Sequence, residues 1–236
     1  MPSLREAWDD HAEQWIAWAR TPGHDSYWRF HRAAFLPILP APGRLTLDVG
    51  SGEGRVSRDL LALGHRVLAV DGSPRLVAAA ASHEGDRAAQ VVGDAAALPL
   101  ADGAADCAVA FMSLHDVDDL ERAVAEVARV LAPGGRLVAA IVHPVNSAGH
   151  FASVDDGLPP FVLTESYFER RRTAEHIDKN GLAMTFHSLH RSLADFCTVL
   201  LEAGFLLELL REVTEPGEDD RWHRFPMFLD LRALRS

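Results

Sequence analysis

The chain lacks most of the features that mark secreted, disulfide-stapled or membrane-spanning proteins. Only two of its 236 residues are cysteines, and Cys107 and Cys197 lie far apart in apolar contexts, which predicts buried thiols in a reducing compartment. No apolar run approaches the ~20 residues that a membrane-spanning helix requires. The first residues show no basic segment followed by an apolar one, so no secretory leader is expected. These absences predict a cytoplasmic protein with no membrane partner.

Positive charge is also scarce. Lys179 is the only lysine, the single local basic run is residues 170–172, and the formal net charge is −11. Nucleic-acid-binding proteins usually carry basic patches, so this balance argues against nucleic acid and against anionic membrane surfaces. A small molecule, neutral or cationic, is the partner that fits best. Nothing in the sequence indicates whether the chain is a monomer or a homodimer.

Apolar residues make up 48% of the chain and are arranged in short runs that alternate with helical patterns. Short continuous runs of this kind are typical of a parallel sheet that helices cover on both faces. A final helix is expected at 193–203, followed by two strands at 206–213 and 228–234 that form an antiparallel pair. The other expected strands are 45–49, 66–70, 89–92, 107–112 and 136–142, and the other expected helices are 56–63, 75–83 and 120–131.

Residues 45–55 carry the most specific local signal. They predict a buried strand, a glycine loop and the start of a helix, in the spacing G-x-G-x-G with Asp48 two residues before the first glycine. Glycines let the backbone approach a ligand closely, and the helix N-terminus offers amides to an anionic group. Dinucleotide-binding folds use G-x-G-x-x-G instead, which argues against a nicotinamide-dependent oxidoreductase, although Asp71 after the second strand would also suit NAD.

Five motifs follow one another along the chain: LDVGSGEGR (47–55), AVDGSP (69–74), VGDAAALP (92–99), FMSLHDV (111–117) and LAPGGRLV (131–138). In this order and spacing the sequence resembles the class I S-adenosylmethionine-dependent methyltransferases of the small-molecule type (methyltransferase type 11/25-like). The resemblance implies an α/β, Rossmann-like fold with a seven-stranded, mostly parallel sheet and a small cap inserted after strand five. It also implies an enzyme that uses S-adenosyl-L-methionine and releases S-adenosyl-L-homocysteine.

The resemblance also implies which residues bind the cofactor. Asp48 and the backbone of residues 50–52 would hold the methionine end, Asp71 would accept both ribose hydroxyls, and Asp94 with Ala95 would meet the adenine amine. Each acid has an ordinary structural alternative as a helix cap or turn residue, and Ser73 competes with Asp71 as a cap. The complete set of expected cofactor-binding residues is Tyr27, Asp48, Gly50, Ser51, Gly52, Asp71, Gly72, Ser73, Asp94, Ala95, Met112 and Ser113.

Two histidines are candidates for the base. In the resemblance, residues 111–116 lie beneath the sulfonium, where an in-line displacement requires a nucleophile positioned within about 3 Å of the methyl carbon. His115 is the first candidate for removing the acceptor's proton, with substrate orientation and a purely structural role as alternatives. His143 follows the fifth strand and is the second candidate, although a histidine before proline also serves as a plain loop terminator.

The remaining segments divide the chain into four parts: a helical lid (1–40), the cofactor-binding core (41–144), a substrate cap (145–190) and the C-terminal helix with the last two strands (191–236). Trp8, Trp15 and Trp18 share one helix face by their spacing, which indicates core packing, a lid over the cofactor, or both. An Asn-Gly pair at 180–181 predicts a hairpin of strands 169–176 and 182–187 within the cap. The expected substrate contacts are Trp28, His187, His190 and Arg191.

Alternatives remain for these residues and for the acceptor. His187 and His190 have a spacing that metal ligands use, but no third ligand is evident, so no metal is expected. Arg191 would meet a substrate carboxylate or form a surface ion pair. Two histidines near the transfer site favour an O-methyltransferase, in natural-product metabolism, over an N- or C-methyltransferase. A non-catalytic S-adenosylmethionine-binding protein is a further alternative, against which the intact glycine loop and Asp71 argue.

Overall fold

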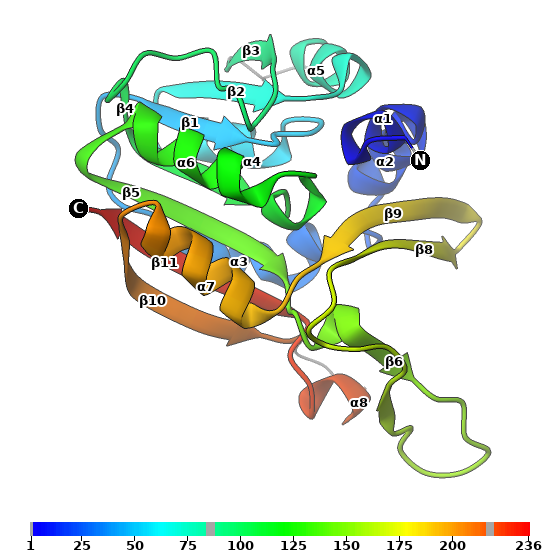
Figure 1. The fold of residues 1–236 in the computed structure, drawn as a ribbon. Helices are drawn as coiled ribbons and strands as arrows, with labels where there is room; N and C mark the ends of the chain where they lie inside the picture. The colour runs from blue at the N-terminus through cyan, green and yellow to red at the C-terminus, as the bar shows by residue number, and fades with distance from the viewer. Residues whose placement is uncertain (1, 84–87, 216–219) are drawn as a thin grey trace.

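The computed structural model describes residues 2–83, 88–215 and 220–236. Its centre is a seven-stranded sheet in the order β10-β11-β5-β4-β1-β2-β3 (Figure 1). Strand β11 runs antiparallel to both of its neighbours, and the other adjacent pairs are parallel. The strands are β1 (Thr46–Val49), β2 (Val67–Asp71), β3 (Ala89–Val92), β4 (Ala105–Phe111), β5 (Leu131–Val142), β10 (Phe205–Val213) and β11 (Phe228–Arg235). The predicted α/β, Rossmann-like, mostly parallel sheet is therefore confirmed.

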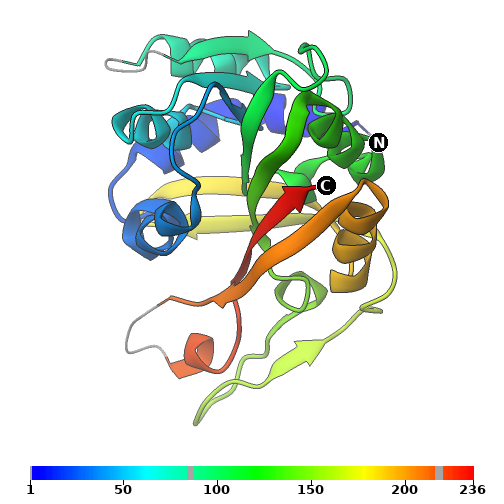
Figure 2. The ribbon, with the colours of Figure 1, turned by 90° about the vertical axis from the view of Figure 1, so that its left-hand side faces the viewer.

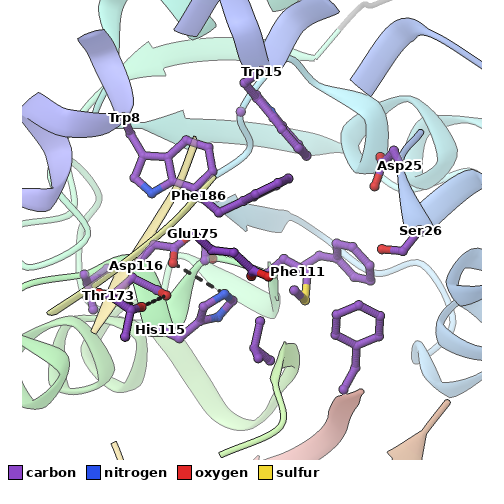
Figure 3. A pocket seen from close by; sticks show the side chains of 18 of the residues that line it. Trp8, Trp15, Asp25, Ser26, Phe111, His115, Asp116, Thr173, Glu175 and Phe186 are labelled. Atoms are coloured by element: carbon purple, nitrogen blue, oxygen red, sulfur yellow. Dashed lines mark hydrogen bonds and ion pairs between the residues drawn. The ribbon is translucent and has the colours of Figure 1, made fainter. Parts of the chain in front are cut away.

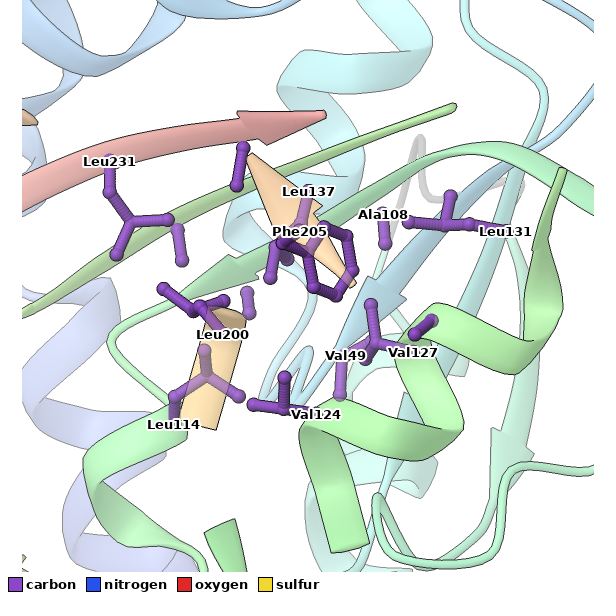
Figure 4. Close-up of a cluster of buried hydrophobic side chains, with 14 of the residues drawn as sticks. Val49, Ala108, Leu114, Val124, Val127, Leu131, Leu137, Leu200, Phe205 and Leu231 are labelled. Carbon is purple, nitrogen blue, oxygen red and sulfur yellow. The ribbon is translucent and has the colours of Figure 1, made fainter. Parts of the chain in front are cut away.

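Helices cover both faces of this sheet because alternate strand residues point to opposite sides. On one face α6 (Leu120–Val130) and α7 (Leu193–Glu202) bury Val124, Val127 and Leu200 against the strands (Figure 4). On the other face α3 (Arg32–Phe35) and α4 (Arg55–Ala62) bury a second apolar cluster. Helix α5 (Pro74–Ala81) packs alongside β2 and β3.

Three further segments lie beyond the C-terminal edge of the parallel strands (Figures 1 and 2). One is the N-terminal pair α1 (Leu4–Asp10) and α2 (Ala12–Arg20), and another is the long hairpin of β8 (Arg171–Lys179) and β9 (Leu182–His190). The third consists of the short hairpin of β6 (Gly149–Phe151) and β7 (Phe161–Leu163), together with α8 (Asp220–His223). Ligands of open parallel sheets bind at this edge, so these segments are placed to enclose a ligand.

Two expectations need correction. The tryptophans at 8, 15 and 18 do not share one helix: the chain leaves the helical conformation at His11 (φ −100°, ψ 12°), whose Nδ1 lies 2.9 Å from the carbonyl oxygen of Ala7, and a second helix begins at Ala12. Strand β5 begins at Leu131 and not at residue 136, because the chain passes directly from α6 into the sheet. The hairpin at Asn180-Gly181 is confirmed, and both residues have the positive φ that a tight hairpin turn requires.

Candidate functional site

A cavity of about 910 Å³ lies at the C-terminal edge of the sheet. The ends of β1, β2 and β4 form its floor, and α1, α2 and the β8–β9 hairpin enclose it from the opposite side (Figure 3). Eleven of the twelve expected cofactor-binding residues line it, Tyr27 being the exception. Their roles in binding remain predictions, but four of the five sequence motifs converge on this cavity, and only residues 131–138 do not line it.

The glycine loop leaves open space where side chains would otherwise stand. Gly50 (φ +69°) and Gly52 (φ +58°) both adopt left-handed backbone conformations. A Cβ on Gly50 would lie 2.4 Å from the Cβ of Ser113, and one on Gly52 would lie 3.3 Å from Nε1 of Trp15. Between them, the buried Ser51 hydroxyl has no hydrogen-bond partner among the residues described. The loop is therefore a narrow cradle with an unused polar group.

Asp71, at the end of β2, joins this loop to helix α5. One of its carboxylate oxygens accepts from the amide of Gly52 and the other from the amide of Ser73, both at 2.8 Å. Burial raises the pKa of Asp71, and the two amide hydrogen bonds oppose that rise. The carboxylate is thus held rigidly with its remaining lone pairs available. Ser73 acts as the predicted cap, because its hydroxyl accepts from the amide of Leu76 at 3.1 Å.

The other expected cofactor-binding residues line the same cavity but differ in how deeply they are buried. Asp48 is buried and accepts from the Ser57 hydroxyl at 2.6 Å. Asp94 is exposed and accepts from the amide of Ala96 at 2.8 Å, as a turn acid does. Met112 has a positive φ of 56°, an unusual conformation for a residue other than glycine. Its neighbour Ser113 donates to the carbonyl of Val49 at 2.6 Å, which ties β4 to β1 at the cavity floor.

His115 and Asp116 lie on a 3-10 turn, Leu114–Asp116, directly after β4. The His115 ring is 7% exposed, its Nε2 lies 3.4 Å from Oδ1 of Asp116, and its Nδ1 has no partner in the described part of the chain. Burial, with a smaller contribution from Arg191, lowers the pKa of His115 to about 3. Burial raises the pKa of Asp116 well above its usual value. Of the two groups, the carboxylate is therefore the stronger base near neutral pH.

Aromatic rings form the opposite wall of the cavity. Trp8 and Trp15 meet edge to face with ring centroids 5.8 Å apart, and Trp15 and Trp18 each contact Phe186 of β9 in the same way. The guanidinium of Arg55 lies 4.5 Å from the ring centroid of Trp15 and pairs with Asp25 at 2.9 Å. A flat or apolar ligand would find these rings on one side of it.

Several residues of this cavity were not expected to be site residues. Phe186 and Glu175 come from the β8–β9 hairpin, and Asp25 and Arg55 come from the N-terminal loop and the first turn of α4. Of these four residues, only Arg55 could have been identified as a site residue from the sequence, because it directly follows the glycine loop. The hairpin residues depend on which strand face turns inward, and polar residues on both faces hide that choice.

The structure does not bring the remaining predicted residues to the cavity wall. Tyr27 is fully buried and donates to Asp59 at 2.6 Å, so its hydroxyl is directed away from the cofactor wall. Trp28 is 45% exposed and donates from Nε1 to the carbonyl of Ala19. His143 is buried outside the lining, where its Nε2 lies 3.2 Å from Glu212.

The other three predicted substrate contacts, residues 187, 190 and 191, do not line the cavity either. The ring of His187 lies tilted by 50° against that of His11, with the centroids 4.7 Å apart. His190 is held by the Ser147 side chain at 2.7 Å and the Tyr167 carbonyl at 2.9 Å. Arg191 is buried and donates to the carbonyls of residues 117 and 118, so it is not the surface ion pair considered above. The positive charge of Arg191 nevertheless lowers the pKa of both His115 and Asp116.

Two searches for other kinds of site gave negative results. Within residues 2–83, 88–215 and 220–236, no three histidine, cysteine or acidic side chains gather closely enough to hold a metal ion. Over the same residues, no helix combines the length and the apolar character that crossing a bilayer demands. Cys107 and Cys197 are both free thiols, the first buried and the second half-buried.

The sequence and the fold were compared with known proteins. Residues 47–139 match a family described as a methyltransferase domain. A demethylmenaquinone methyltransferase from Thermobifida fusca is 36% identical over 120 residues, which cover 49% of this chain and 50% of that protein. The chain thus spans about half the length of the curated relatives it matches.

Solved structures share the fold over most of the chain. A putative S-adenosylmethionine-dependent methyltransferase from Listeria monocytogenes superposes with a TM-score of 0.74 at 20% identity, covering 90% of this chain and 100% of that one. An S-adenosylmethionine-dependent methyltransferase from Mesorhizobium loti gives 0.69 at 24% identity, over 86% and 96% of the two chains. At these identities the likeness is one of fold.

Proposed function

We propose that the chain is a class I, S-adenosylmethionine-dependent methyltransferase that transfers a methyl group to a small organic acceptor. The match of residues 47–139 to a methyltransferase domain and the shared fold support this proposal. The observation that carries the proposal is that the glycine loop, Asp71 and the His115–Asp116 pair open on one cavity. A cofactor cradle and a proton acceptor are thereby placed within reach of one bound acceptor molecule.

The chain's own residues fit this cofactor. The amides at the start of α4 and the unpartnered Ser51 hydroxyl suit an amino-acid carboxylate. The rigid carboxylate of Asp71 suits two ribose hydroxyls, and Asp94 lies at the rim where an adenine amine would reach it. S-adenosylmethionine supplies an activated methyl group, whose bond to sulfur breaks with the electron pair left on sulfur while a lone pair of the acceptor forms the new bond.

The residues around the acceptor provide positioning and proton transfer. The rings of Trp8, Trp15 and Phe186 hold the acceptor and exclude water, which strengthens the electrostatic interactions inside. The Asp116 carboxylate, whose Oδ1 lies 3.4 Å from Nε2 of His115, takes the proton that the acceptor loses, either directly or through His115. His115 remains our candidate for direct contact with the acceptor, and we no longer propose a catalytic role for His143, because it lies outside the lining.

The acceptor atom is a separate question. The prediction of oxygen rested on two histidines near the transfer site, and only His115 lines the cavity, so the geometry supports oxygen less than the sequence did. The role in natural-product metabolism stays a prediction. The name of the Thermobifida fusca relative refers to a quinone precursor, and the aromatic wall would suit a flat acceptor of that general kind. We propose an acceptor with an aromatic or other flat apolar part.

Calorimetric titration of the full chain with S-adenosylhomocysteine tests the cofactor assignment. We expect one saturable site with a Kd below about 100 μM, which corresponds to roughly 5–6 kcal/mol. NADH, titrated in parallel, should not bind. Binding of NADH without binding of S-adenosylhomocysteine would identify the oxidoreductase alternative and refute the proposal.

A further inference from the structure

Two carboxylates face the cavity with no bonded cation. The Oδ1 atom of Asp116 is buried and has no hydrogen-bond partner among the described residues, and His115 Nε2 is 3.4 Å away. Glu175 reaches the cavity from β8, and its carboxylate makes no hydrogen bond or ion pair within the described ranges. Glu175 is exposed toward the cavity, and partial loss of hydration beside the cavity wall is the one cause that raises its pKa. Carboxylates in poorly hydrated surroundings are costly unless a cation meets them.

Arg5, Arg29, Arg55 and Lys179 line the cavity, but none of the described arginines or lysines forms an ion pair with Asp116 or Glu175. Arg55 is paired with Asp25 at 2.9 Å, and Lys179 donates to the carbonyl of Gly23 at 2.6 Å. Arg191 lies outside the cavity lining and lowers the pKa of Asp116 without forming an ion pair with it. Asp116 and Glu175 are therefore both left for a cationic ligand to meet. The Nδ1 atom of the buried His115 ring also has no hydrogen-bond partner among the described residues, so it too is available to a ligand.

The rings beside these carboxylates are suited to a cationic ligand with an aromatic body. Figure 3 shows His115, Asp116, Thr173 and Glu175 gathered on one side, with Trp8, Trp15 and Phe186 next to them. A cation within about 6 Å of a ring centroid is attracted by the ring. Arg55, 4.5 Å from the centroid of Trp15, already uses this attraction on one of these rings. The remaining ring surface can pack against an aromatic group of the ligand.

We propose that the methyl acceptor is a protonated arylalkyl amine, whose ammonium lies between Glu175 and Asp116 and whose ring packs among Trp8, Trp15 and Phe186. The proposal rests on the proposed function and narrows it to a class of acceptor. Before transfer the ammonium gives one proton to the Asp116–His115 pair, and the freed nitrogen lone pair forms the new bond to carbon as the bond from carbon to sulfur breaks. The product is a protonated secondary amine together with S-adenosylhomocysteine.

Three probes of matched shape test the charge requirement: phenethylamine, 2-phenylethanol and 3-phenylpropanoate. Each is titrated calorimetrically into the full chain saturated with S-adenosylhomocysteine. We expect phenethylamine to bind at least about tenfold more tightly than 2-phenylethanol, because a charge-assisted contact is stronger than a neutral one. The carboxylate probe should bind most weakly. Equal binding of the amine and the alcohol, or no binding of the amine, overturns the proposal.

Two variants test whether Glu175 is responsible for the preference for the amine over the alcohol. Glu175→Gln should reduce the preference for the amine over the alcohol to near unity while the affinity for S-adenosylhomocysteine is unchanged. Glu202→Gln, an exposed glutamate on α7 away from the cavity, is the matched control and should keep the full preference. A preference that survives in Glu175→Gln refutes the assigned subsite. Failure of S-adenosylhomocysteine to bind the unmodified chain would instead refute the proposed function, so the two failures are distinguishable.

Discussion

Asp71 illustrates how one side chain serves both the fold and a ligand. Its two oxygens are fixed by amides from the glycine loop and from the start of α5, which leaves the charge rigidly placed at the cavity. A rigid carboxylate loses little entropy when a diol binds, and its charged hydrogen bonds are stronger than neutral ones. The sequence indicated the position of this residue, because an acid at the end of a parallel strand lies at the ligand edge wherever the sheet forms, and its role in binding stays a prediction.

Asp71→Asn should weaken S-adenosylhomocysteine binding by about 1.5–3 kcal/mol, the usual size of a hydrogen bond to a charged group. The amide keeps an acceptor oxygen but loses the charge and presents a donor to one of the two backbone amides. Calorimetric titration measures the change. Asp178→Asn, on the exposed turn of the β8–β9 hairpin, is the control and should bind as the unmodified chain does. Unaltered affinity in Asp71→Asn would show that this carboxylate does not hold the cofactor.

The His115–Asp116 pair makes a prediction about pH. Burial raises the pKa of Asp116 and lowers that of His115 to about 3, so Asp116 and not His115 is the group of this pair expected to gain or lose a proton as the pH is changed. A carboxyl accepts a proton only above its pKa, and kcat/KM should therefore rise with pH through a value above the ordinary pKa of aspartate. In Asp116→Asn this acidic limb should disappear and the rate should be lower throughout. An identical limb in both proteins would assign it to another group.

Residue types alone could not identify this pair. His115 was singled out as a base with a nearly neutral pKa, whereas burial makes it a weak base and shifts the proton affinity to Asp116. Such a shift depends on how many atoms surround the ring and on the buried charge of Arg191, which lies 76 positions further along the sequence. Sequence proximity showed that the two groups are neighbours but not how far each is removed from water.

At the scale of elements, the glycine loop is shaped by the strand next to it. Gly50 follows β1, and the space a side chain would need is taken by Ser113 at the end of β4. Ser113 is itself held by its hydrogen bond to Val49. Strand β4 therefore sets the shape of the cradle and ties the β1 loop to the turn Leu114–Asp116 that follows it.

Gly50→Ala should abolish detectable cofactor binding and lower the free energy of unfolding by about 1–3 kcal/mol, through a left-handed backbone and a contact at 2.4 Å. Calorimetric titration and urea denaturation measure the two effects. Gly134→Ala is the comparison: its φ is also positive (+79°), but no atom lies within 4 Å of the added Cβ, so it should lose some stability and keep its affinity. Equal affinity in both variants would contradict the role given to the cradle.

Sequence patterns located the core elements better than the enclosing ones. The buried strands were placed within a few residues because their apolar runs are bounded by glycine, aspartate and proline. The N-terminal segment was mistaken for one helical face, since the spacing of Trp8, Trp15 and Trp18 fits a continuous helix and nothing in the residues near His11 marks the break. The tryptophans of both helices still face the cavity, because the packing of the two helices on the rest of the molecule orients them in this way.

At the scale of the whole molecule, a buried polar group joins the N-terminal segment to the last strand. Asp230 of β11 is fully buried, lies 2.7 Å from Nε2 of His31 and accepts from Arg211 of β10 at 2.8 Å. Arg211 also donates to the carbonyl of Ala34. The helical segment 27–35, which follows α2 and covers one face of the sheet, is thus anchored to the antiparallel edge of the sheet.

Asp230→Asn should lower the free energy of unfolding by about 2–4 kcal/mol, because a buried charge pair loses one partner. Urea denaturation followed by circular dichroism measures the loss. Asp178→Asn again serves as the exposed control and should change the stability by less than about 0.5 kcal/mol. A similar small change in Asp230→Asn would mean that packing, not this network, holds the segment.

Sequence motifs predicted the whole sheet and the cofactor edge because both depend on local chain chemistry repeated along one domain. They did not predict which acceptor the cavity prefers. That choice depends on Glu175 and Phe186 of the hairpin and on Trp8 and Trp15 of the N-terminal helices, four side chains from distant parts of the chain. Their convergence follows from how the enclosing segments fold back on the sheet, which no local pattern encodes.

The positions of the tryptophans have a practical consequence. Four of the five line the cavity (Trp8, Trp15, Trp18 and Trp222), and Trp28 lies outside it. Indole emission depends on the polarity and charges around the ring, so the protein carries a built-in optical reporter of whatever enters. Occupancy by colourless ligands can thus be followed in unlabelled protein, which makes screening of acceptor libraries practical before any turnover is known.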